Sequence, residues 1–173
     1  VGTKNFDKMK SVASMEDNNV KFISFCLRVL NKHGYKDSQK KTNIYYAIIE
    51  NLEMIGDEYK YVANFIAENK KKIKFTKELE AVLKHTNEFF QEFYEIFYKF
   101  EKDKQIDIIK MRNELYNHAN ELFLKQDAYG AMFLHHLINI INLTRETINI
   151  YYEARIWVNN IIGIAFCIGW TGN

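Results

Sequence analysis

The stretch KELEAVLKHTNEFFQEFYEIFYKF, residues 77–100, carries the pattern that decides the fold class. Its apolar positions recur at steps that alternate between four and three residues, which is the heptad spacing of helices packed in a left-handed bundle. The members of this seam are Leu79, Leu83, Thr86, Phe90, Phe93, Phe97 and Phe100. Thr76 precedes the stretch and is a typical helix N-cap, so we predict a long helix over residues 76–100.

The same helical period continues upstream of this seam. A helix is expected to end at Gly34, which is a common C-terminal stop. The inward face predicted for that helix consists of Phe22, Phe25, Cys26, Val29 and Leu30. A second helix, capped by Asp37 or Ser38, should run to about Asn69, where the lysine-rich residues 70–74 form a solvated connector.

Two further helices are predicted downstream, at about residues 107–125 and 128–157, the latter capped by Asp127. The inward positions of the fourth helix are Ile108, Met111, Leu115, Ala119 and Leu122. Those of the fifth are Phe133, Leu137, Ile140, Thr144, Ile148 and Tyr151. About five long helices joined by short turns predict an all-α, antiparallel helical bundle.

The composition favours the same fold class. The chain has 173 residues, of which none is proline and only seven are glycine, and 47% are hydrophobic. Sandwiches and propellers need many turn residues, so both are disfavoured. The net charge of +2 is too small for a dedicated nucleic-acid binder, and we expect no direct nucleic-acid binding by this segment. Two isolated cysteines, Cys26 and Cys167, and no recognisable signal segment predict reduced, buried thiols in a cytoplasmic protein.

Three acidic side chains form a stripe on the second predicted helix: Glu50, Glu53 and Asp57. At about 100° per residue, with Leu52 as zero, they lie near 160°, 100° and 140°, whereas the apolar face centres near zero. All three therefore share the face that points away from the core. Glu53 and Asp57 are four residues apart, so both can reach one cation, either a divalent ion or an iron- or zinc-type metal. The alternative is an ordinary solvated acidic face.

The stretch YYAIIENLEMIGDEYKYVANFI, residues 45–66, resembles the signature helix of PhoU-type phosphate-signalling proteins. That family carries a Glu/Asp-x-x-x-Asp motif within a phrase such as LERIGD, and this chain has LEMIGD at residues 52–57. PhoU-like proteins consist of two tandem three-helix bundles. The resemblance therefore implies that residues 1–75 are helices two and three of the first bundle. Residues 76–173 would be the second bundle with an apolar C-terminal tail. The missing first helix, and in archaeal relatives a small DNA-binding domain, would precede Val1.

The resemblance also implies a function and partners. PhoU-like proteins are non-enzymatic regulators of phosphate uptake and phosphate signalling. They bind the ATPase of a phosphate ABC transporter, a sensor kinase, or both, and they reach the membrane only through such partners; a homodimer is also allowed. The second repeat carries INLTRET at residues 141–147, where Asn142 replaces the first acid and Glu146 the second. A metal site is therefore expected at Glu50, Glu53 and Asp57 of the first repeat and weakened in the second.

Two other classes of function compete with this interpretation. A ferritin-like di-iron bundle would use histidines and carboxylates, and Glu114 with His118, or the adjacent His135 and His136, are the candidates. Such a bundle needs Glu-x-x-His on two helices, pointing inward, and this chain has no Glu-x-x-His. The other class is a metal-free oligomerisation or interaction module, in which the apolar tail or the heptad seam makes an oligomer. The uncharged residues 156–170 of that tail would extend the last helix onto the bundle or onto a partner subunit. Because no nucleophile motif or glycine-rich phosphate loop occurs, we expect no enzymatic activity.

Overall fold

Five helices make up the part of the chain that the computed structural model describes, residues 6–35, 38–101 and 103–167, with side chains described for residues 18–155 of these ranges. They are α1 (Phe6–His33), α2 (Gln39–Asn69), α3 (Lys77–Tyr98), α4 (Lys104–Phe123) and α5 (Ala128–Cys167). No strand occurs within these ranges, so the predicted all-α fold is confirmed.

Side-chain caps explain where three of the helices begin. Ser38 Oγ accepts a hydrogen bond from the amide of Lys41, and Thr76 Oγ1 accepts one from the amide of Leu79, both at 3.3 Å. Asp127 Oδ1 accepts bonds from two backbone amides in the first turn of α5. These oxygens satisfy amides that have no partner within their own helix. The caps predicted at Thr76 and Asp127 are confirmed, and Ser38 caps α2.

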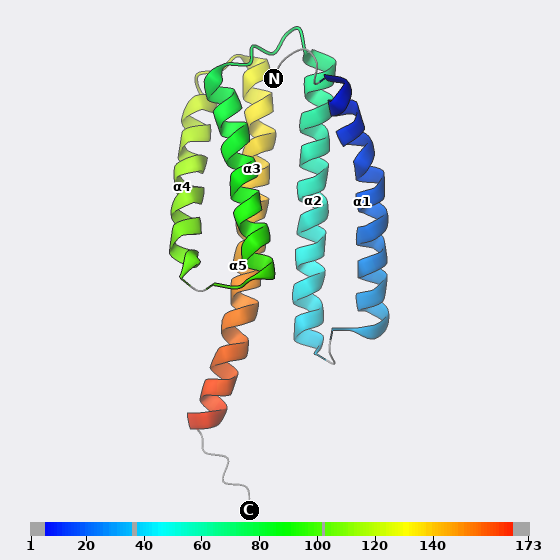
Figure 1. Ribbon diagram of the computed structural model, residues 1–173, viewed down its shortest axis with the longest axis vertical. Coiled ribbons are helices and arrows are strands. Elements are labelled where there is room, and N and C mark those ends of the chain that lie inside the picture. The colour runs from blue at the N-terminus through cyan, green and yellow to red at the C-terminus, as the bar shows by residue number, and fades with distance from the viewer. Residues whose placement is uncertain (1–5, 36–37, 102, 168–173) are drawn as a thin grey trace, which may run out of the picture.

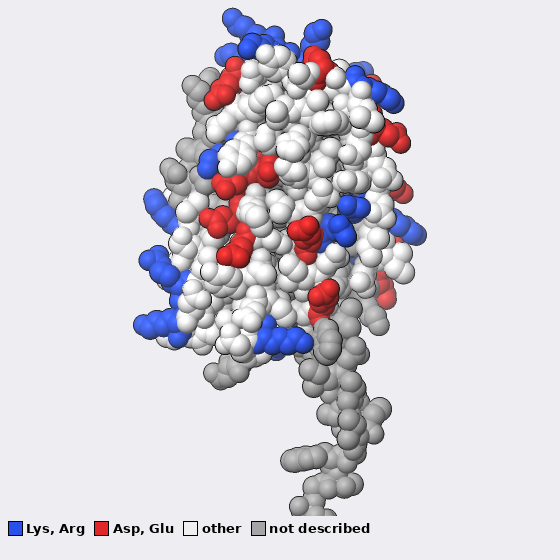
Figure 2. Space-filling model, turned by 180° about the vertical axis from the view of Figure 1, so that it is seen from behind, with Lys and Arg blue, Asp and Glu red and all other residues white. Residues whose placement is uncertain are grey.

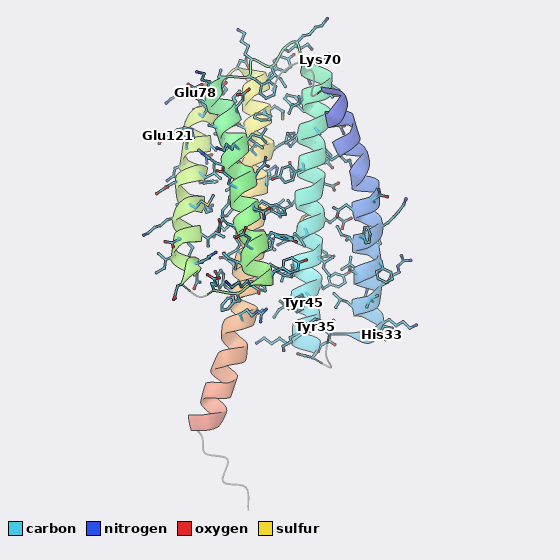
Figure 3. All side chains as sticks on the ribbon, in the orientation of Figure 1. His33, Tyr35, Tyr45, Lys70, Glu78 and Glu121 are labelled. Atoms are coloured by element: carbon cyan, nitrogen blue, oxygen red, sulfur yellow. The ribbon has the colours of Figure 1, made fainter. Side chains whose placement is uncertain are left out.

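The turn between α1 and α2 depends on Gly34. Its φ of 65° lies in the left-handed region, which glycine adopts without steric cost. The next residue, Tyr35, donates its backbone amide to Thr42 Oγ1 at 2.9 Å, and its ring lies 4.3 Å from the ring of Tyr45. Figure 3 shows His33, Tyr35 and Tyr45 together at this end of the molecule, with Lys70 at the opposite end of α2.

The helices alternate in direction, and α5 is the central one (Figure 1). The backbone of α5 lies close to α2, α3 and α4, and α3 also lies against α4. Within the described residues, α1 lies against α2 and close to no other helix. An α1–α2 pair is therefore joined, through the contact between α2 and α5, to a three-helix bundle of α3, α4 and α5.

The core confirms the inward faces predicted for the last two helices. All six predicted positions of α5 are buried, as are those of α4 except the half-buried Met111. In α3 the predicted seam is displaced. Its buried positions are Leu79, Val82, Thr86, Phe89, Phe93 and Ile96. Four seam residues are only half-buried at the edge of the core: Leu83, Phe90, Phe97 and Phe100. Because α3 packs against both α4 and α5, it buries a stripe wider than a two-helix seam.

The inward face predicted for α1 is mostly wrong. Ile23 and Leu30 are buried, whereas Phe22 is 71% exposed, Phe25 60% and Val29 39%. The reason is that α1 packs against a single helix, which covers only one narrow stripe of its apolar surface. We call Phe22, Phe25 and Val29 the apolar stripe of α1.

The predicted burial of the cysteine thiols is wrong for Cys26, which is exposed. It lies one turn from Phe22 and from Val29, on the same uncovered side of α1. The side chain of Cys167 lies outside the described residues. The backbone of α5 continues to Cys167, past the ends of the other helices (Figure 1), so the helical extension predicted within residues 156–170 is present. What that tail contacts lies outside the described side chains.

Among the helices in the described part of the chain, none combines the length and the apolar character that a membrane crossing requires.

Candidate functional site

A groove of about 360 Å³ runs between α2 and α5, where the phrases LEMIGDE and INLTRET face each other. Its lining residues from α2 are Met54, Asp57, Glu58 and Tyr61. Those from α5 are Asn139, Asn142, Leu143 and Glu146. Three of these side chains are carboxylates and none is basic. Figure 2 shows acidic side chains gathered on the face opposite to that of Figure 1. We call this feature the acidic groove.

One carboxylate of the acidic groove connects the two helices. Glu58 Oε2 lies 2.7 Å from Nδ1 of His136, and Glu58 Oε1 accepts a hydrogen bond from Asn139 Nδ2 at 3.0 Å. The side chains of Glu58 and His136 are only 17% and 18% exposed. The ring of His136 also lies beside the rings of Tyr61 and Phe65, at centroid distances of 5.9 and 6.4 Å. These contacts fix the register of α2 against α5.

Of the three acids predicted to hold a metal, Asp57 is the one that lines the acidic groove. Its Oδ1 lies 3.3 Å from Nζ of Lys60, one turn further along α2. Glu50 is exposed and Glu53 is half-buried, and neither lines this groove. Within the described side chains, no group of three or more His, Cys, Asp or Glu residues is arranged to hold a metal ion. The metal site therefore stays a prediction from the spacing of Glu53 and Asp57.

The residues considered for a di-iron centre do not lie inside the bundle. Glu114 and His118 are exposed on α4, where with His85 of α3 they line a separate groove. His135 is exposed, and His136 is half-buried in its contact with Glu58. The buried polar residues of the described chain are Thr42, Asn51, Thr86, Thr144 and Thr147. None of these is a carboxylate or a histidine, so the described core gives a ferritin-type centre no support.

Comparisons of the chain with protein-family models, with curated proteins and with solved structures found no match. The PhoU-like family and its phosphate-related function are therefore predictions that rest on the LEMIGDE phrase.

The sequence interpretation missed the contributions of Glu58 and Asn139 to the acidic groove. A signal for the α5 side was present, because His135, Asn139, Asn142 and Glu146 follow steps of four, three and four residues. That is the same period as the apolar core of α5, so a polar stripe accompanies the core along one flank of the helix. Such a stripe could have identified the flank that borders α2.

Proposed function

We propose that this chain is a non-enzymatic regulator of phosphate uptake and phosphate signalling, which acts by binding a protein partner at the acidic groove. The observation that carries the proposal is that carboxylates from the two quoted phrases, Asp57 of LEMIGDE and Glu146 of INLTRET, line one groove. By resemblance, the partner is the ATPase of a phosphate ABC transporter, a sensor kinase, or both, and the setting is the cytoplasm.

The rim of the acidic groove has residue types that are typical of protein-binding surfaces. Met54 is 44% exposed and Tyr61 is 45% exposed, and both residue types are enriched at interfaces. Glu146 is exposed and has no ion-pair partner among the described residues. A partner segment that places Lys or Arg beside Glu146 and Asp57 would match this charge, which increases the association rate and the specificity.

The test is a binding measurement by biolayer interferometry, with this chain immobilised and the transporter ATPase or the sensor kinase of the same organism in solution. Asp57→Lys and Glu146→Lys should each weaken binding by about tenfold, as the loss of roughly 1–2 kcal/mol of charge complementarity implies. The control is Glu121→Lys, an equal charge change on α4, which does not line the groove (Figure 3).

The outcomes separate the two parts of this proposal. If all three variants weaken partner binding equally, the effect is due to net charge, and the acidic groove is not the binding site. If the unmodified chain binds neither protein, the role in phosphate regulation is overturned, whatever the variants do.

The metal at Glu50, Glu53 and Asp57 is a separate part of the proposal. Two or three carboxylates on one helix are few ligands for a divalent cation, and Lys60 competes for Asp57. Its test is the metal content of the chain after loading with Mn²⁺, Fe²⁺ or Zn²⁺ and desalting. The double variant Glu53→Ala/Asp57→Ala should retain less metal than the unmodified chain. Equal metal content in the variant and the unmodified chain would contradict the proposed metal site.

A second candidate function, a metal-free oligomerisation or interaction module, is favoured by the apolar stripe of α1. Three large apolar side chains lie exposed along a helix that has one neighbour within the described residues. Contiguous exposed apolar surface of this kind is typical of protein-binding sites. A second copy of the chain is the simplest occupant, and the corresponding experiment is among the predictions below.

A further inference from the structure

Two of the four arginines in the chain, Arg112 of α4 and Arg145 of α5, line one groove. The groove lies where α3, α4 and α5 meet and has a volume of about 360 Å³. Its other lining residues are Phe89, Ile108, Ile109, Asn113, Ile148 and Asn149. No carboxylate is among them. We call this feature the arginine groove.

Arg112 is held in place by neutral groups. Its Nη1 donates to Asn113 Oδ1 at 3.0 Å, and its Nη2 donates to Asn142 Oδ1 at 3.1 Å. Its Cζ lies 4.3 Å from the centre of the Tyr116 ring. The third nitrogen, Nε, is buried and has no hydrogen-bond partner among the described residues. The guanidinium is therefore positioned, keeps an unused donor and has no carboxylate against it.

The second arginine adds an uncompensated positive charge. Arg145 is exposed and forms no ion pair with any described residue. Burial lowers the pKa of Arg112, and repulsion from Arg145 lowers that pKa further. The adjacent Glu146 lines the acidic groove rather than the arginine groove. Two like charges in a partly desolvated site repel each other. An anion bound between them would be attracted to both arginines, which would offset this repulsion.

We propose that the arginine groove binds a small oxyanion of the phosphate class, with Arg112 and Arg145 as its cationic donors. The planar fork of a guanidinium matches the oxygens of a phosphate group in a bidentate manner. Asn113 uses its Oδ1 for Arg112, so its Nδ2 is left to donate to the anion. Phe89, Ile108 and Ile148 form a buried apolar wall on one side of the groove, and an apolar wall strengthens charge interactions beside it. Asn142, which accepts from Arg112 Nη2, also lines the acidic groove, but Arg112 and Arg145 do not, so phosphate binding and partner binding can be measured separately.

The test is isothermal titration calorimetry of the full chain with inorganic phosphate in a chloride buffer. We expect saturable binding that Arg112→Gln and Arg145→Gln each weaken by roughly 10- to 100-fold, the effect of losing one charge-assisted contact. The matched control is Arg28→Gln, which removes the same charge from α1. Arg28 is exposed and donates to the backbone carbonyl of Ser24 at 3.1 Å. This control should bind phosphate as the unmodified chain does.

Two additional measurements keep the result interpretable. Because Arg112→Gln also loses packing on Tyr116, far-UV circular dichroism must show an intact helical content, and the exposed Arg145→Gln provides an independent variant. In NMR spectra, the Nε–H resonance of Arg112 should shift with added phosphate and not with added chloride. Glycerol 3-phosphate and sulfate are titrated in parallel, so that a free ion and the phosphate group of a small ester can be told apart.

Saturable binding of either phosphate source that depends on Arg112 and Arg145 supports the proposal and identifies the source. Absence of saturable binding for phosphate, glycerol 3-phosphate and sulfate at millimolar concentration overturns it. Equal weakening in Arg28→Gln also overturns it, because the effect would then be unspecific screening of a basic surface.

Discussion

Glu58 of α2 and His136 of α5 are 78 positions apart in the sequence, and their Oε2 and Nδ1 atoms lie 2.7 Å apart. The same carboxylate accepts a hydrogen bond from Asn139, one turn further along α5. The contact between α2 and α5 is the one that joins the α1–α2 pair to the other three helices. A single, mostly buried carboxylate therefore lies at the junction between the two parts of the described chain.

Replacing Glu58 with Ala should lower the free energy of unfolding by about 1–3 kcal/mol, because His136 and Asn139 would lose their partner in a mostly buried place. Urea denaturation followed by far-UV circular dichroism measures this loss. Glu121→Ala, on the exposed surface of α4, should change stability by less than about 0.5 kcal/mol. In a double-mutant cycle with His136→Ala, strictly additive effects would show that the pair does not act as a unit.

Alkaline pH should destabilise the fold through Tyr59. Burial raises the pKa of its hydroxyl from 10.0 to about 12, and the hydroxyl donates to Asn87 Oδ1 at 2.9 Å. Between pH 10 and about 12 the unfolded chain releases this proton first, so the contribution of Tyr59 is complete below pH 10 and is lost as the pH rises. The loss amounts to at most about 3 kcal/mol, because each pKa unit corresponds to about 1.4 kcal/mol.

The measurement is the urea midpoint of the unmodified chain and of Tyr59→Phe as a function of pH. The variant should show a shallower alkaline decline. Part of the decline should persist, because burial, and then the hydrogen bond with Tyr35, raise the pKa of Tyr45 to about 12 as well. Identical declines in the two proteins would contradict the role assigned to Tyr59.

Replacing Gly34 with Ala should destabilise the turn between α1 and α2. A residue with a side chain at a φ of 65° is strained by about 1–2 kcal/mol, and the added Cβ would lie 3.3 Å from Thr42 Oγ1. Thermal unfolding should show a lower midpoint. Gly34→Asn is the informative companion, because asparagine tolerates this backbone region better. If Ala and Asn were equally harmless, the turn would not require the left-handed conformation.

The apolar stripe of α1 should govern self-association rather than folding. Phe22→Ser/Phe25→Ser changes two exposed side chains and should leave the urea midpoint nearly unchanged. Light scattering after size exclusion, over a range of protein concentrations, should show a dimer for the unmodified chain and a monomer for the double variant. The neighbouring Ile23→Ser alters a buried position and should lower stability by about 2 kcal/mol or more. If the unmodified chain is monomeric at every concentration, the proposed dimer is contradicted.

The sequence was sufficient to predict the helices and the inward faces of α4 and α5. A helix with neighbours on several sides, as α5 has, buries its whole apolar stripe, so the pattern alone identifies the core. For α1 the same reasoning failed, because the pattern contains no information on how many neighbours cover the stripe. Phe22 and Ile23 are both apolar, and packing decides which of them is buried.

The candidate sites were less accessible from the sequence. Asp57 was identified by its spacing on one helix, which is a local property. The partnership of Glu58 with His136 depends on the register between two helices that are distant along the chain. That Arg112 of α4 and Arg145 of α5 line one groove likewise depends on the register between two helices. Local periodicity fixes a residue's place on its own helix and leaves its neighbours on the next helix undetermined.

The central position of α5 has a consequence for biosynthesis. α5 is the last of the five described helices to leave the ribosome, and α2, α3 and α4 all pack against it. At a translation rate of roughly 5–20 residues per second, several seconds separate the completion of α2 from the emergence of α5. During that interval α1 can pair with α2, but the core-facing side of α2, with Ile48, Ile55 and Ile66, is still uncovered. The nascent chain therefore exposes this apolar surface until α5 has emerged, and the bundle can close only after that point.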